Sequence, residues 1–151
     1  MKYIGIDPGI NGGVAVIDNY YSISTFKCPK TPVEMAEALK ETIDDEAVAL
    51  LEKVHSFPGQ GVVSTFTFGT NYGQWQGILS ALGVEYEFIT PKMWQKKYQP
   101  LSKEKKDRKN QLKQLAKDKF PSEKVTLYTS DAILLALYLS CLLYTSDAAD
   151  E

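Results

Sequence analysis

The chain has 151 residues and a mass of 16.9 kDa, which is the size of a single domain with one core. With 44% hydrophobic and 24% charged residues, a net charge of −2 and only two cysteines, it is neither a disordered chain nor a disulfide scaffold. No apolar run approaches the roughly 18 residues of a membrane span. The N-terminus, MKYIGID, has the pattern of a strand rather than of a signal segment, and we expect a cytoplasmic protein.

The N-terminal part predicts a three-stranded meander followed by a helix. Residues 3–6 form an apolar strand that ends in a turn at Asp7-Pro8-Gly9. Residues 14–17 form a second strand, close enough to pair with the first as a hairpin, and residues 20–26 have the composition of a third. Thr31 is a favourable helix cap because proline follows it at the first helical position.

The middle of the chain predicts two more strands with a loop and a helix between them. Residues 47–54 form a mostly apolar strand, interrupted by Glu52. Residues 57–70 are rich in Gly, Ser and Thr, and their apolar residues follow neither the helical nor the strand period. The sequence therefore predicts a loop. An amphipathic helix over 75–82 and a strand over 84–89 follow. The aromatic residues expected in the core are Phe66, Phe68 and Trp75.

The C-terminal part predicts three helices. A short one covers residues 91–98, a charged one covers 102–120, and an apolar one covers 131–139. The resulting order, three strands and then helices alternating with two further strands, predicts an α/β fold in which helices flank a mixed sheet.

Charge is distributed unevenly along the chain. Residues 92–124 contain twelve Lys or Arg and four acids, whereas residues 1–91 contain five basic and eleven acidic residues. A basic segment beside an acidic body suits a phosphate-rich partner, although a solvated charged helix would have the same composition. The candidate contacts to backbone phosphates are Lys92, Lys96, Lys97, Lys103, Lys105, Lys106, Arg108 and Lys109.

Three acids lie at the ends of apolar elements. Asp7 follows the first strand, Glu52 interrupts the fourth, and Asp131 opens the last helix. Oxygen ligands in such an arrangement suit Mg²⁺, and a divalent ion can promote phosphodiester cleavage. Each acid also has an ordinary structural explanation: Asp7 as a turn residue, Glu52 as the partner of a lysine, and Asp131 as a favourable charge at a helix N-terminus.

Four blocks of sequence resemble a known family. GIDPGINGG at 5–13, LLEKVHSFPGQGVVSTFTFG at 50–69, TPKMWQK at 90–96 and SDAILLALYL at 130–139 occur in the order found in RuvC-type Holliday junction resolvases, and the second block is similar to the phage-type branch. This resemblance implies a ribonuclease H-like mixed five-stranded sheet flanked by helices. Asp7 and Glu52 would lie on neighbouring central strands, and the last helix would bring Asp131 alongside them.

The resemblance also implies an activity. Asp7, Glu52 and Asp131 would be the catalytic and metal-binding residues of a Mg²⁺-dependent endonuclease, with Mn²⁺ able to substitute. A homodimer would make two symmetric cuts in a four-way DNA junction during recombination and repair, in a bacterial or phage-infected cell, leaving 5′-phosphate and 3′-hydroxyl ends. In the resemblance, His55 and Phe57 face the junction centre and would stack on unpaired bases, although a lone histidine is more often structural.

The chain departs from the family pattern at one place. Many members carry a further aspartate three or four residues before the one that Asp131 matches, where this sequence has Tyr128 and Leu127. Two alternatives therefore stay open: a junction-binding or nucleic-acid-binding module without catalysis, and a related nuclease that cuts RNA or other branched DNA.

The C-terminal segment has a different character from the rest. Residues 141–151, CLLYTSDAADE, resemble a sequencing adapter translated in frame. The six-residue sequence LYTSDA at 143–148 also occurs at 127–132, but the next residue differs: Ile133 follows the first copy and Ala149 the second. We therefore predict a nuclease domain over residues 1–140 and a non-native tail over 141–151.

Overall fold

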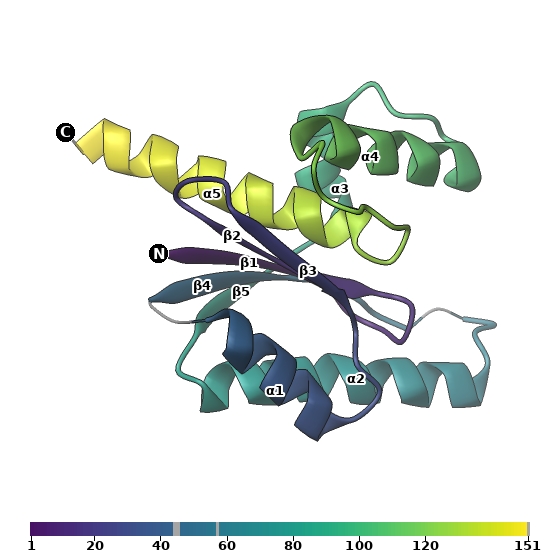
Figure 1. Ribbon diagram of the computed structural model, residues 1–151. Coiled ribbons are helices and arrows are strands. Elements are labelled where there is room, and N and C mark those ends of the chain that lie inside the picture. Colours follow the sequence, from purple (N-terminus) through teal and green to yellow (C-terminus); the bar gives the residue numbers. More distant parts are fainter. Residues whose placement is uncertain (44–45, 57, 151) are drawn as a thin grey trace.

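The fold is a five-stranded mixed sheet between two layers of helices (Figure 1). The computed structural model describes residues 1–43, 46–56 and 58–150, and of residues 144–150 the backbone alone. The strands are β1 (Lys2–Asp7), β2 (Gly13–Asp18), β3 (Ile23–Lys27), β4 (Ala47–Glu52) and β5 (Glu85–Ile89). They lie in the order β3-β2-β1-β4-β5. The meander β1-β2-β3 is antiparallel, and β4 and β5 continue the sheet in parallel with β1, which confirms the expected mixed sheet.

Helices cover both faces of the sheet. They are α1 (Pro32–Thr42), α2 (Val62–Ala81), α3 (Pro91–Gln95), the 3₁₀ turn η1 (Lys96–Tyr98), α4 (Lys105–Lys119) and α5 (Ser130–Asp150). Helices α1 and α2 lie on one face, and α3, α4 and α5 lie on the other (Figure 1). Ile4 and Ile6 of β1 belong to the core under α1 and α2. Because side chains alternate along a strand, Gly5 and Asp7 face α5.

Helix α5 lies directly against the backbone of the central strand. A Cβ atom added at Gly5 in β1 would overlap the carbonyl oxygen of Ala132 and would lie 2.6 Å from the backbone nitrogen of Ala136. Ala132 and Ala136 are one helical turn apart and carry small side chains, so glycine and two alanines together permit this close approach. The contact therefore sets the position of α5 over the sheet.

The expected loop over 57–70 is wrong, because α2 begins at Val62. The exposed side of this helix bears Val62, Phe66 and glycines instead of charged residues, which leaves no amphipathic period to detect. Phe66, expected in the core, is 76% exposed, whereas Phe68 is half-buried. Trp75 is fully buried, as expected.

The last helix is longer than the sequence suggests. Helix α5 was expected over 131–139 but runs from Ser130 to Asp150 without a break at residue 141. Cys141 packs partly buried against the core. The backbone therefore marks no boundary there, and the foreign origin of residues 141–151 stays a prediction. Among the described residues no helix combines the length and the apolar character that crossing a membrane requires.

The tight contact at Gly5 predicts the effect of Gly5→Ala. Alanine is normally preferred over glycine within a strand by about 0.5–1 kcal/mol, but the added methyl group would push α5 away from β1. We expect the free energy of unfolding to fall by about 2–3 kcal/mol in urea denaturation. Ser24→Ala, at an exposed position on β3, is the matched control and should change stability by less than about 0.5 kcal/mol. An unchanged or raised stability of Gly5→Ala would contradict the close approach.

Candidate active site

Two of the three predicted acids lie side by side at one edge of the sheet. Strands β1 and β4 are parallel neighbours, and Ile6 is paired with Leu51. The next residue on each strand, Asp7 and Glu52, is the last of its strand. Ile6 and Leu51 both belong to the core beneath the α1–α2 face, so Asp7 and Glu52 point to the α5 face. The parallel register therefore juxtaposes these two carboxylates.

Helix α5 adds the third acid. Asp131 lies in its first turn, immediately before Ala132, which packs on Gly5. A cavity of about 490 Å³ is lined by all three carboxylates, Asp7, Glu52 and Asp131. The structure thus brings together residues that are up to 124 positions apart in the sequence, as the sequence analysis expected.

The three carboxylates are shielded from solvent and lie near one another: Glu52 is buried, and Asp7 and Asp131 are half-buried. Burial is the main cause that raises the pKa of Glu52 to about 7, and the charge of Asp131 adds to it. Burial likewise raises the pKa of Asp131 to about 6, against the opposing effect of Lys109 and Arg108. The pKa of Asp7 is raised well above its usual range by burial and then by Glu52 and Asp131. The site therefore concentrates negative charge that a cation would relieve.

Trp94 makes a contact that the sequence analysis did not identify. Its indole Nε1–H donates a hydrogen bond of 2.8 Å to Oε2 of Glu52, and both side chains are buried. This bond opposes the rise in the pKa of Glu52, since it favours the charged form. Trp94 lies in the TPKMWQK block, whose resemblance to the family was the available signal.

Asn71 supports the turn after Asp7 and was also missed. Its Oδ1 accepts a hydrogen bond of 2.7 Å from the backbone N–H of Gly9. Gly9 has a φ of +112°, a conformation that side-chain-bearing residues rarely adopt, and the ring of Phe68 lies against it. Asn71 is buried on the same face of α2 as Trp75, four residues later, so extending that helix backwards would have found it.

The basic candidates divide into three groups. Lys105 and Lys109, one turn apart on α4, line the cavity together with the three acids. The side chain of Arg108 donates hydrogen bonds to the carbonyl oxygens of Ser102 and Lys103, which holds the start of α4. The remaining candidates are exposed and do not line that cavity: Lys92, Lys96, Lys97, Lys103 and Lys106.

The loop after β4 is only partly described. His55 lines the cavity together with Gln60. Phe57, the other predicted stacking residue, lies outside the described residues. Placement of His55 beside the carboxylates is consistent with the position that the family resemblance implies for this loop.

The place of the further family aspartate holds a different contact. The ring of Tyr128 lies under the ammonium group of Lys27, with Nζ 4.2 Å from the ring centre. Among the described residues, no group of three or more His, Cys, Asp or Glu side chains has the geometry of a complete metal-binding cluster. The three carboxylates thus share a cavity without forming a cluster of that kind.

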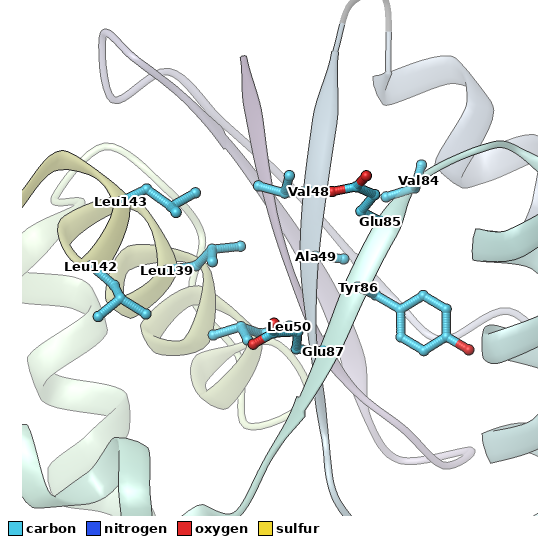
Figure 2. A pocket seen from close by; sticks show the side chains of 10 residues that line it. All are labelled: Val48, Ala49, Leu50, Val84, Glu85, Tyr86, Glu87, Leu139, Leu142 and Leu143. Carbon is cyan, nitrogen blue, oxygen red and sulfur yellow. The ribbon is translucent and has the colours of Figure 1, made fainter. Parts of the chain in front are cut away.

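A second cavity, of about 480 Å³, lies elsewhere and has a different lining (Figure 2). It is bounded by β4, the edge strand β5 and the C-terminal half of α5, through Leu50, Glu87 and Leu139 among others. None of the three acids lines it, and most of its lining is apolar. We therefore place the candidate site in the cavity that contains Asp7, Glu52 and Asp131.

The raised pKa values predict an unusual pH dependence of stability in the metal-free protein. Unfolded Glu52 loses its proton near its ordinary pKa of 4.5, whereas the folded protein holds that proton up to about pH 7. Between these values the folded state binds more protons at Glu52, so the stability should fall as pH rises, and the contribution of Glu52 to this fall should end above pH 7. Urea unfolding in chelator at pH 5, 6, 7 and 8 measures this slope.

Glu52→Gln should raise the free energy of unfolding at pH 8 by about 2 kcal/mol and flatten that slope, because it removes the buried charge. The exposed Glu85→Gln is the control and should leave the slope unchanged. A Glu52→Gln variant that is less stable than the parent at pH 8 would show that the carboxylate is not destabilising.

Comparison with known proteins identifies the fold. No protein-family model and no curated protein sequence matches this chain. Among solved structures, RuvC of Thermus thermophilus in complex with Holliday junction substrate matches with a TM-score of 0.67 and 15% sequence identity, over 97% of this chain and 96% of that one. A second Thermus thermophilus RuvC structure matches with a TM-score of 0.61 and 15% identity, over 97% of both chains. The chain therefore has the α/β, ribonuclease H-like fold of RuvC, as the sequence resemblance implied.

Proposed function

We propose that this chain is a metal-dependent endonuclease that resolves four-way DNA junctions by paired symmetric cuts. One observation carries the proposal: three carboxylates from β1, β4 and α5 meet in one cavity, with Lys105 and Lys109 at its wall. A similar fold was solved with a Holliday junction substrate, which supports branched DNA as the substrate class. The phage-type branch is proposed on the sequence of residues 50–69 alone.

The residues present fit a divalent cation of the Mg²⁺ or Mn²⁺ type. Asp7, Glu52 and Asp131 offer carboxylate oxygens, the ligands that these ions prefer. Burial raises the pKa of each, and repulsion by neighbouring carboxylates adds to the shift at Asp7 and Glu52, so a bound cation would stabilise the charged forms. Because the three carboxylates, which all lie among the described residues, do not form a complete metal-binding cluster, water and substrate phosphate oxygens would complete the coordination.

The proposed reaction is hydrolysis of a phosphodiester. When bound, the metal would lower the pKa of a water molecule and balance charge on the phosphate oxygens. The water oxygen forms a bond to phosphorus, the bond from phosphorus to the 3′ oxygen breaks, and the 3′ oxygen takes up a proton. Lys105 and Lys109 would hold the scissile phosphate against the acids. The hydrogen bond from Gly9 to Asn71 keeps the turn after Asp7 in place.

The basic segment would hold the rest of the DNA. Lys92, Lys96 and Lys97 are exposed on α3 and η1. Helix α3 begins two residues after Ile89, the last residue of β5, which pairs with Glu52. Contacts of this kind bind phosphates without reading base sequence, so shape would direct the enzyme to junctions. His55, at the cavity wall, would contact unpaired bases there.

Helix α2 supports a homodimer. Its 20 residues include no charged side chain. Val62 and Phe66, 86% and 76% exposed, share a face with Gly69, Gly73 and Gly77, whose added Cβ atoms would meet nothing within 4 Å. An exposed apolar helix face lined with glycines lets a second helix approach closely. Two copies related by two-fold symmetry would provide the two active sites that opposed cuts require.

One observation favours a second candidate function. Tyr128 is paired with Lys27 where many family members carry a fourth acid, which would suit a module that binds junctions without cutting them. A related nuclease acting on RNA or on other branched DNA has the same three acids. Substrate and metal dependence separate these candidates from the junction resolvase.

Cleavage of a synthetic immobile four-way junction tests the proposed activity. We expect paired symmetric nicks in Mg²⁺ or Mn²⁺, none in chelator, and none on a matched linear duplex or RNA–DNA hybrid. Asp7→Asn, Glu52→Gln and Asp131→Asn should each reduce the rate to at most about 1% of the parent rate, while the exposed Glu85→Gln should not. Tight junction binding without cleavage would favour the binding module, and cleavage of the hybrid would favour the RNA nuclease.

Phe66→Glu tests the dimer. A charge on the exposed apolar face of α2 should convert a dimer of 16.9 kDa chains into monomers in analytical ultracentrifugation and replace paired nicks with single ones. Tyr20→Glu changes an aromatic residue that is 91% exposed at the tip of the β2–β3 hairpin, and should leave the dimer intact. A parent protein that is monomeric at every concentration, and with junction bound, would contradict this assembly.

A further inference from the structure

Trp94 holds one oxygen of the buried acid Glu52. The indole Nε1 lies 2.8 Å from Oε2, and neither side chain is appreciably exposed to solvent. A tryptophan N–H can only donate, so this bond specifies which carboxylate oxygen lies against the indole. The bond occupies one lone pair of Oε2, so Oε1 is the oxygen more available to a cation or to the reacting water.

The backbone holds Trp94 at this position. Strand β5 ends at Ile89, which pairs with Glu52, and its carbonyl accepts a hydrogen bond from Lys53 N–H. Thr90 follows and caps α3, since its side chain accepts from the N–H of Met93. The chain thus turns from the strand into the helix next to Glu52. This turn places the indole of Trp94, in α3, against the Glu52 carboxylate.

The same segment is tied to the helix that carries Asp131. The ring of Tyr98 packs edge-on against Trp94, with ring centres 6.1 Å apart. The Tyr98 hydroxyl donates a hydrogen bond of 3.3 Å to the carbonyl oxygen of Leu134, three residues after Asp131 on α5. Residues 94 and 98 therefore connect the strand of one acid with the helix of another.

We propose that Trp94 is a positioning residue that orients Glu52 toward the metal and substrate. Tyr98 packs against Trp94 and fixes its position relative to α5. This inference rests on the proposed metal-dependent function and adds to it a residue outside the acidic set. Partners that hold a metal ligand typically account for 10- to 100-fold in metal affinity or activity. Phenylalanine keeps an aromatic ring in part of this space and removes the N–H, so the orientation of Glu52 is lost.

Trp94→Phe tests the hydrogen bond in the full chain. Calorimetric titration with Mn²⁺ should show an affinity at least about 10-fold weaker than that of the parent, and the cleavage rate at saturating junction should fall with little change in KM. Trp75→Phe is the matched control: Trp75 is equally buried, in the core on the other face of the sheet, and its loss should change Mn²⁺ affinity less than about twofold. Thermal unfolding of both variants verifies that they fold.

A second measurement needs no variant that removes Trp94. The chain has two tryptophans, so its ¹⁵N-labelled form should show two indole N–H cross-peaks, which Trp75→Phe assigns. On titration with Mg²⁺, the Trp94 indole signal should shift and saturate with the calorimetric dissociation constant, while the Trp75 signal should stay in place. This result would be decisive even if Trp94→Phe failed to fold.

The outcomes distinguish this inference from the function on which it rests. Uptake of metal with an unmoved Trp94 signal, or with unchanged affinity and cleavage rate in folded Trp94→Phe, would overturn the positioning role alone. No uptake of Mg²⁺ or Mn²⁺ by the parent protein, with and without junction, would overturn the proposed metal-dependent function and the positioning role with it.

Discussion

The close approach of α5 to β1 at Gly5 is the contact on which the candidate site depends. Sheet register alone brings Asp7 next to Glu52, because parallel neighbours end at the same edge. Asp131 reaches them only because Gly5 lets the helix backbone lie against the strand. A larger residue there would move the third carboxylate relative to the other two, so one glycine in the core constrains the geometry of a site that it does not touch.

The site carries an electrostatic cost that the rest of the fold offsets only in part. One buried and two half-buried carboxyl groups share the site, and burial raises the pKa of Glu52 and Asp131, so their environment disfavours the charged forms. Lys109 and the indole of Trp94 act in the opposite direction. A scaffold selected for stability alone would place apolar residues here, so the arrangement itself argues for a cationic ligand.

The two faces of the sheet have different roles in the proposed enzyme. The face under α5 and α4 bears the acids and the lysines that line their cavity. The opposite face is covered by α2, whose outer side is uncharged and apolar. Asn71 and Phe68 of that helix also reach the turn after Asp7, so the proposed dimer face and the candidate site are connected through a single element.

The sequence by itself determined the five strands, the order of the helices and the three acids, because alternating and helical apolar patterns and strand-end carboxylates are local features. It also identified the family whose fold the chain shares. The start of α2 was not predictable in this way, since an outer face of Val62, Phe66 and glycines carries no amphipathic period. Only the tertiary structure decided which residues the side chains of Trp94 and Asn71 meet, because their contacts with Glu52 and Gly9 span 42 and 62 residues of sequence. Such long-range pairs depend on how strands and helices pack, which no local pattern encodes.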